Sequence, residues 1–186
     1  MVELHALWLP IVASAVVVFL ASSLIHMVLP WHKGDYPALP GEEKFRAAVG
    51  PLAIPPGDYL VPRAGSNAEM QSPEFAKKLN EGPVMLLTVM KPGPWTMGSN
   101  LSQWFVFVLV VGVFAAYVAG RALGEGANYL AVFRFAGVTA FCCYAVGVWP
   151  QSIWYKRGWL LAVKSTFDGL IYGLLTGGVF GWLWPR

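Results

Sequence analysis

Four apolar stretches constrain this chain more than any other feature, because each is long enough to cross a lipid bilayer as a helix. A hydrocarbon core about 30 Å thick requires about 20 helical residues. The stretches are residues 6–29, 101–123, 129–149 and 159–184. With 56% hydrophobic and 12% charged residues among 186, the chain has the composition of a multi-pass membrane protein and not of a soluble enzyme. We therefore predict an all-α transmembrane fold with four membrane-spanning helices.

Residues 31–100 separate a first helical region, residues 1–30, from the remaining three helices in residues 101–186. This segment holds ten of the fourteen prolines and most of the charged residues, so we expect it outside the membrane. A proline-rich segment with few large apolar residues cannot bury a large core, and we expect it to lie against the bilayer, the ends of its own helices or a partner.

Local signals predict three elements within the proline-rich segment. One helix is expected at about residues 41–49, and a second begins at Ser72, which can cap it, with Pro73 in the first turn. Residues 84–90 are apolar but too short to span a bilayer, and their pattern fits either a buried strand or an interfacial segment.

The distribution of basic residues predicts the orientation in the membrane. Lys33, Lys91, Lys156, Arg157 and Lys164 flank one side, against Arg121, Arg134 and Arg186 on the other. The positive-inside rule then places residues 31–100 in the cytoplasm and both termini outside. We interpret the first stretch as a retained helix and not as a secretory signal, because no Lys or Arg precedes it.

Tryptophan residues mark the ends of the apolar stretches. Indole rings collect at the boundary between headgroups and hydrocarbon, so we expect a membrane-interface belt. Its expected members are Trp8, Trp31, Trp95, Trp104, Trp149, Trp154, Trp159, Trp182 and Trp184. The rings are not interleaved with a basic patch, so the lipid bilayer is an expected contact and nucleic acid is not an expected partner.

The fourth stretch contains an ionisable residue, Asp168, about one helical turn inside the expected hydrocarbon core. Lys164 lies four residues earlier on the same helix face, and Tyr172 lies one turn deeper. One interpretation is a carboxylate that binds a proton or a cation. The other is a structural polar network of Lys164, Asp168 and Tyr172 that fixes a helix contact. The shallow depth and the nearby partners favour the structural network.

Glycines at every fourth position follow Asp168, namely Gly169, Gly173, Gly177 and Gly181. Such a stripe exposes backbone that a close neighbouring helix can cover, as in GxxxG crossings, and it predicts a glycine zipper. The spacing does not say whether the partner helix belongs to this chain or to another.

His26 lies near the inner end of the first helix, on one face with Ser14, Val18 and Ser22. An imidazole in this position can ligate haem or a chlorin, or relay protons. No second histidine is expected at matching depth on another helix, and single histidines near a membrane boundary commonly bind serine or backbone atoms. The hydrogen-bonded histidine is therefore the favoured interpretation, and lipid is the non-protein contact that we expect.

Motifs of catalytic chemistry are missing from the sequence. It has no HExxH, no glycine-rich phosphate loop and no carboxylate pair within the apolar stretches. Cys142 and Cys143 are adjacent, so they form no CxxC metal motif and are most simply packing residues. We expect no enzymatic activity, no catalytic residues and no metal site.

Two stretches of the sequence resemble those of small four-helix bacterial inner-membrane proteins to which no activity is assigned. They are residues 26–36 (HMVLPWHKGDY) and residues 164–185 (KSTFDGLIYGLLTGGVFGWLWP). The resemblance covers mainly the first and last helices. It implies a location in the bacterial cytoplasmic membrane and a functional role for the pattern in residues 168–185, and it implies no activity.

These observations together predict a non-catalytic accessory subunit of a larger bacterial membrane complex, respiratory or photosynthetic. Its expected partners are other integral membrane proteins, which it contacts through the glycine helix and the proline-rich segment. Two alternatives stay open. One is a small ion-coupled transporter centred on Asp168 and His26, and the other is a pigment- or haem-binding subunit that uses His26.

Overall fold

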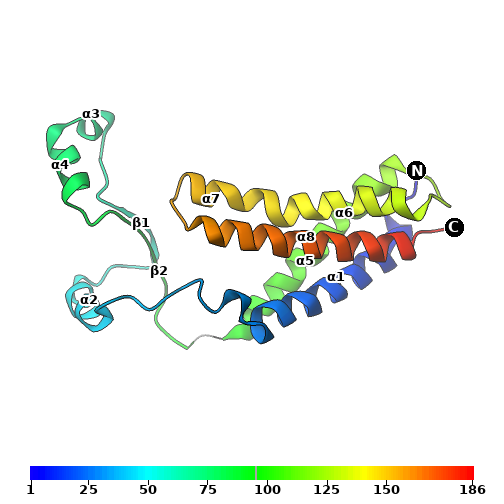
Figure 1. Ribbon diagram of the computed structural model, residues 1–186, viewed down its shortest axis with the longest axis horizontal. Helices are drawn as coiled ribbons and strands as arrows, with labels where there is room; N and C mark the ends of the chain where they lie inside the picture. Colours follow the sequence, from blue (N-terminus) through cyan, green and yellow to red (C-terminus); the bar gives the residue numbers. More distant parts are fainter. Residues whose placement is uncertain (95) are drawn as a thin grey trace. The chain divides into compact units, whose positions relative to one another are not determined.

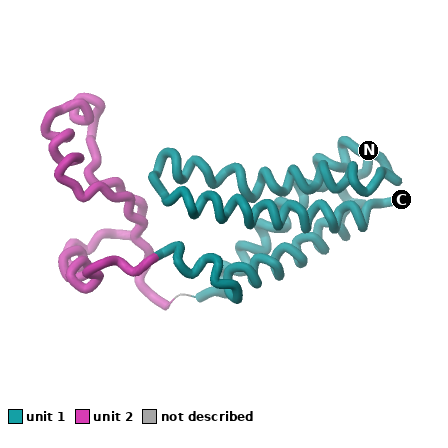
Figure 2. Tube along the Cα trace, in the orientation of Figure 1, with its two compact units in different colours: residues 1–36, 96–186 teal, residues 37–95 magenta. Residues whose placement is uncertain are grey.

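The computed structural model describes residues 1–94 and 96–186, and the chain forms two compact units. The first unit consists of residues 1–36 and 96–186, and the second consists of residues 37–95 (Figure 2). Trp95, one of the tryptophans expected in the interface belt, lies outside the described residues.

The first unit is built from four long helices that run alongside one another (Figure 1). They are α1 (Trp8–Ser23), α5 (Met97–Ala122), α6 (Tyr129–Ala145) and α8 (Trp159–Trp182). Short turns extend two of them: Leu4–Leu7 and the π-helical Leu24–Val28 flank α1, while Val146–Val148 and α7 (Trp149–Ile153) follow α6.

Among residues 1–94 and 96–186, three helical segments are long and apolar enough to span a membrane, which indicates a membrane protein. They are Leu4–Val28, Met97–Ala122 and Tyr129–Ile153. Helix α8 has a comparable length of 24 residues but carries Lys164 and Asp168, and it is not one of the three. Helix α5 begins at Met97, four residues before the expected start of the second apolar stretch.

Hydrogen bonds join both termini and the α5–α6 turn at one end of the first unit. The backbone N–H of Val2 donates to the carbonyl of Gly120 at 2.8 Å, and that of Gly126 donates to Pro185 at 2.8 Å. The indole Nε1 of Trp184 donates to the carbonyl of Gly124 at 2.9 Å. Trp184 is 6% exposed, so this ring packs inside the protein, and its expected place in the interface belt stays a prediction.

The four glycines of the expected ladder all face α6 of the same chain. A Cβ built on Gly173 would lie 2.9 Å from the carbonyl oxygen of Gly137, and one on Gly177 would lie 2.7 Å from that of Phe133. The outer two glycines, Gly169 and Gly181, meet Ala145 and Tyr129 equally closely. The partner that the sequence left open is therefore a helix of this chain, and another protein would have to contact a different face.

The second unit combines short helices with a small sheet. Its elements are α2 (Glu42–Val49), a 3-10 turn (Gly50–Leu52), β1 (Gly57–Val61), α3 (Asn67–Met70), α4 (Pro73–Glu81) and β2 (Met85–Val89). The expected helices near residues 41–49 and after Ser72 are confirmed, and the Ser72 hydroxyl accepts a hydrogen bond from the Phe75 N–H at 3.1 Å.

The apolar residues 84–90 supply β2, which pairs antiparallel with β1 from Gly57↔Val89 to Val61↔Met85. The expected all-α class is therefore corrected: the chain is mostly helical but contains a two-stranded sheet. Strand β1 was not predicted from the sequence, because a proline pair precedes it and no alternation of apolar and polar residues marks it.

Candidate functional site

Five ionisable side chains gather at the end of the first unit that is remote from the termini. Here the segment that follows α1 meets the first half of α8. The residues are His26, His32, Asp35, Lys164 and Asp168. Hydrogen bonds link four of them, and the fifth, His26, stacks on His32.

The end of α1 explains why the two histidines meet. The helix passes into a π-helical turn, Leu24–Val28, and Leu29 is extended (φ −76°, ψ 147°) because the residue before a proline avoids the helical region. Pro30 then opens a 3-10 turn that returns the chain toward α1. The imidazole of His32 consequently stacks on that of His26, with ring centroids 4.2 Å apart and an interplanar angle of 12°.

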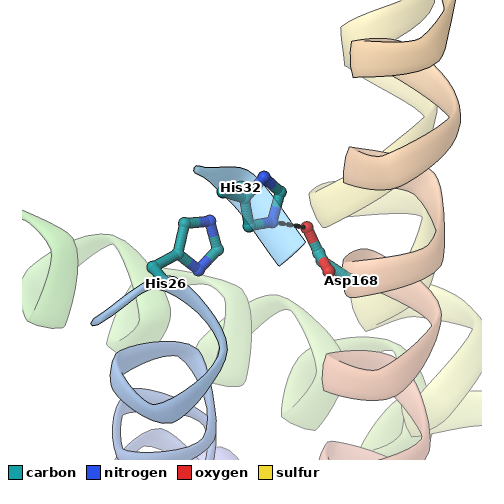
Figure 3. A group of neighbouring side chains, drawn as sticks. All are labelled: His26, His32 and Asp168. Carbon is teal, nitrogen blue, oxygen red and sulfur yellow. Dashed lines mark hydrogen bonds and ion pairs between the residues drawn. The ribbon is translucent and has the colours of Figure 1, made fainter. Parts of the chain in front are cut away.

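His32 lies between two carboxylates. Its Nδ1 lies 2.5 Å from Oδ2 of Asp35, and its Nε2 lies 2.9 Å from Oδ2 of Asp168 (Figure 3 draws the second pair). Both carboxylate side chains are buried, with 7% and 6% exposure. Because an ionised carboxylate only accepts, a ring nitrogen that faces one donates a proton to it or shares a cation with it.

Lys164 joins this cluster through Asp35. Its ammonium donates to Oδ1 of Asp35 at 2.5 Å and to the carbonyl of Trp31 at 2.7 Å, and it lies 5.5 Å from the centre of a Trp31 ring. The hydrogen bond from Lys164 holds the pKa of the Asp35 carboxyl below its usual value, against the effect of burial. The expected ion pair between Lys164 and Asp168 is corrected, because the structure pairs Lys164 with a carboxylate from the segment after α1 instead.

Tyr172 also departs from the expected network. Its ring packs edge-on against Tyr144 at 5.4 Å and against Trp104 at 6.2 Å. Within residues 1–94 and 96–186, its buried hydroxyl has no hydrogen-bond partner, and neither does the buried Oδ1 of Asp168. Tyr172 is thus a core residue here and not a donor to Asp168.

His26 forms the backbone hydrogen bond that the sequence analysis favoured. Its Nδ1 donates to the carbonyl of Ser22 at 3.0 Å, and the Ser22 hydroxyl accepts from Nε1 of Trp104 at 2.8 Å. This contact places the Trp104 indole partly inside the protein, and its expected place in the interface belt stays a prediction. His26, His32 and Asp168 each offer one possible metal-ligand atom, and the three atoms lie within 4.8 Å of one another.

Six other tryptophans of the expected belt are exposed on the first unit: Trp8, Trp31, Trp149, Trp154, Trp159 and Trp182. Their interface position stays a prediction. Trp149 also donates from Nε1 to the Thr166 hydroxyl at 3.0 Å, which ties the start of α7 to α8.

Comparison with known proteins assigns no family. No protein-family model, no curated protein and no solved structure matches this chain. The cluster nevertheless joins the two stretches singled out in the sequence: residues 26–36 contribute two histidines and Asp35, and residues 164–185 contribute Lys164 and Asp168. His32 and Asp35 were not among the predicted site residues. The one sequence signal for them is Pro30, which opens the turn that brings this segment back toward α1.

Proposed function

We propose that this chain is a four-span protein of the bacterial cytoplasmic membrane and a non-catalytic accessory subunit of a larger membrane complex, respiratory or photosynthetic. Helix α8 supplies the fourth span. It packs along α6, which lies within a segment apolar enough to span the membrane, and the ladder glycines bring the two backbones close. The buried pairing of Asp168 with His32 lowers the cost of carrying a charge on such a helix.

The observation that carries the accessory role is the exposure of apolar side chains in the second unit. Among the described residues 37–94, Phe75 is the one buried side chain, at 6% exposure. Many large apolar side chains are exposed there: Leu39, Leu52, Leu60, Met70, Leu79, Val84, Leu86 and Met90. A unit with so small a core is stabilised when another surface covers these groups, and neighbouring membrane proteins offer such a surface.

The polar cluster suits the same role. It ties the segment after α1 to α8 through three hydrogen bonds, so it fixes where the chain leaves the bundle toward residues 37–95. By the positive-inside rule, this end of the first unit faces the cytoplasm and both termini face outward.

Native purification tests the accessory role directly. The protein is extracted in a mild detergent, and the material that copurifies with it is identified by mass spectrometry. We expect other integral membrane proteins in stable proportion to this chain. Purification of the chain alone, or of a homo-oligomer only, would contradict the proposal.

A matched pair of variants makes this test specific to the second unit. Leu60 and Leu86 are cross-strand neighbours and are 53% and 42% exposed, so changing both to Asn should leave the fold intact and release the partner. Lys77→Ala on α4 is the control, since that side chain is 73% exposed and polar. Retention of the partner by the Leu60→Asn/Leu86→Asn variant would contradict the proposed contact surface.

A second candidate is a small ion-coupled transporter centred on Asp168 and His26. The observation in its favour is the Oδ1 atom of Asp168, which is buried and has no hydrogen-bond partner among the described residues. In liposomes, Asp168→Asn should then abolish ion-dependent flux while the protein still folds and assembles. Loss of assembly without any measurable flux in the natural sequence would instead support the accessory role.

The third candidate, a haem or chlorin bound through His26, has less support. The His32 ring already stacks on His26, so a macrocycle would have to displace it. An absorption spectrum of gently solubilised protein tests this candidate. A colourless preparation from pigment-replete cells would remove it.

A further inference from the structure

We propose that His26, His32 and Asp168 form a binding site for a divalent transition-metal ion, with Zn²⁺ as the ion that their ligand set fits best. Two imidazoles and one carboxylate are common zinc ligands, and a water molecule completes a tetrahedral site. This inference goes beyond the accessory role and does not depend on it.

The distances are close to those that a metal ion requires. The three ligand atoms lie within 4.8 Å of one another. Zinc bonds of about 2.0–2.1 Å in a tetrahedron keep ligand atoms about 3.3 Å apart, so binding needs an approach of up to about 1.5 Å. It also needs a rotation of the His26 ring out of its stack on His32, because the nitrogen lone pairs lie in the ring planes and must point at the same ion. His26 is exposed and lies in a single π-helical turn, a feature that is frequent at functional sites, so its side chain can make this movement.

Each histidine is held by the contact that metal-binding histidines typically make. A metal-bound imidazole usually donates its other N–H to a carboxylate or a backbone carbonyl, which orients the ring. Here Nδ1 of His32 donates to Asp35, and Nδ1 of His26 donates to the carbonyl of Ser22. These contacts leave Nε2 of each ring as the ligand atom, and Lys164 in turn holds Asp35 in place.

The carboxylate supplies an independent observation. Asp168 is 4% exposed, and its Oδ1 is buried without a hydrogen-bond partner within the described part of the chain. Leaving a buried charged acceptor unsatisfied is costly, whereas a metal ion bound by this carboxylate would compensate its charge. The ion would take the place of the proton between His32 Nε2 and the Asp168 carboxylate, and binding through both carboxylate oxygens would give Oδ1 the partner that it lacks.

The hydrogen bonds that join α8 to the segment after α1 do not involve His26. Even without His26, these links would join the two elements. They run from His32 to Asp168 and from Lys164 to Asp35, and His32 is also linked to Asp35 within that segment. The stacked position of His26 beside His32 adds the third ligand, and its exposure gives an ion a route to the site (Figure 3).

Zinc titration of the full chain tests the proposal. The protein is purified without a polyhistidine tag, treated with a chelator, dialysed, and titrated with ZnCl₂ in a calorimeter. We expect one ion per chain, and an affinity reduced at least about tenfold by His26→Ala, His32→Ala or Asp168→Asn. The control is His5→Ala, which alters an exposed histidine outside the cluster and should bind zinc as the natural sequence does.

A second measurement avoids dependence on variants that fold poorly. X-ray absorption of the zinc-loaded natural sequence should show nitrogen and oxygen neighbours with the outer-shell scattering of two imidazoles. Fewer than two imidazoles, or no saturable binding at a one-to-one ratio, would overturn the proposal. Equal zinc affinity in the natural sequence and in folded His32→Ala would overturn it as well.

Discussion

Nε2 of His32 lies 2.9 Å from Oδ2 of Asp168, and this hydrogen bond joins residues 136 positions apart in the chain. It connects the segment that follows α1 to the first half of α8, where both side chains are largely buried. The pairing changes which residue compensates the acidic side chain of the last helix. Asp168 is held by a residue from another part of the chain, and Lys164 compensates a different carboxylate, Asp35.

We expect His32→Ala to destabilise the first unit by about 3 kcal/mol, because it leaves the buried Asp168 carboxylate without its partner. Asp168→Asn should cost less, about 1 kcal/mol, since the amide keeps the shape and can still hydrogen-bond. Unfolding by SDS in mixed micelles measures both free energies.

The double variant, His32→Ala with Asp168→Asn, checks whether the two residues act as a pair. The double variant should lose less unfolding free energy than the sum of the losses in the two single variants, because each single change removes the same contact. Losses that add to within about 0.5 kcal/mol would contradict the pairing.

The glycine ladder gives a second prediction with a control on the same helix. Gly177→Ala places a Cβ 2.7 Å from the Phe133 carbonyl, so α6 and α8 must separate, at a cost of about 1–3 kcal/mol. At Gly178 the nearest atom to a new Cβ is the Tyr129 hydroxyl oxygen, at 3.7 Å, which is an ordinary contact. Gly178→Ala should therefore leave stability unchanged or slightly higher. Equal unfolding curves in SDS for the two variants would show that the α6 contact is not close.

The orientation predicted from the basic residues can be tested by cysteine labelling in intact cells. In a background with Cys142→Ser and Cys143→Ser, Glu125→Cys lies in the turn between α5 and α6, and Lys77→Cys lies on α4. A membrane-impermeant maleimide should label Glu125→Cys from outside and should reach Lys77→Cys only after the membrane is opened. The reverse pattern would place residues 37–95 outside the cytoplasm.

Sequence signals predicted the long helices and the start of α4, because these features depend only on residues close together in the chain. The caps at Ser72 and the apolar lengths of α1, α5 and α6 are of this kind. Strand β1 was missed because it is a strand only through its pairing with β2, which comes some thirty residues later. The hydrogen bond of Trp184 could not be predicted for a similar reason, since the Gly124 carbonyl accepts its indole N–H across the end of the bundle.

In the candidate site, too, local features could be predicted from the sequence and long-range contacts could not. The sequence drew attention to Asp168 and His26 separately, because an acid and an imidazole are rare in apolar stretches. It assigned Asp168 the partners that helical periodicity allows, Lys164 and Tyr172. His32 and Asp35 were not considered as partners, because nothing in their spacing relates them to α8.

The sequence by itself determined that this chain has helices long and apolar enough for a membrane, a separate proline-rich segment, and a last helix with one face of glycine. Composition and periodicity suffice for these features, because they depend on transfer free energy and on local backbone geometry. Only the tertiary structure decided that the glycine face of α8 packs against α6 and that Asp168 hydrogen-bonds to His32. Those contacts depend on the turn at Pro30 and on how the helices pack, and both act between residues far apart in the chain.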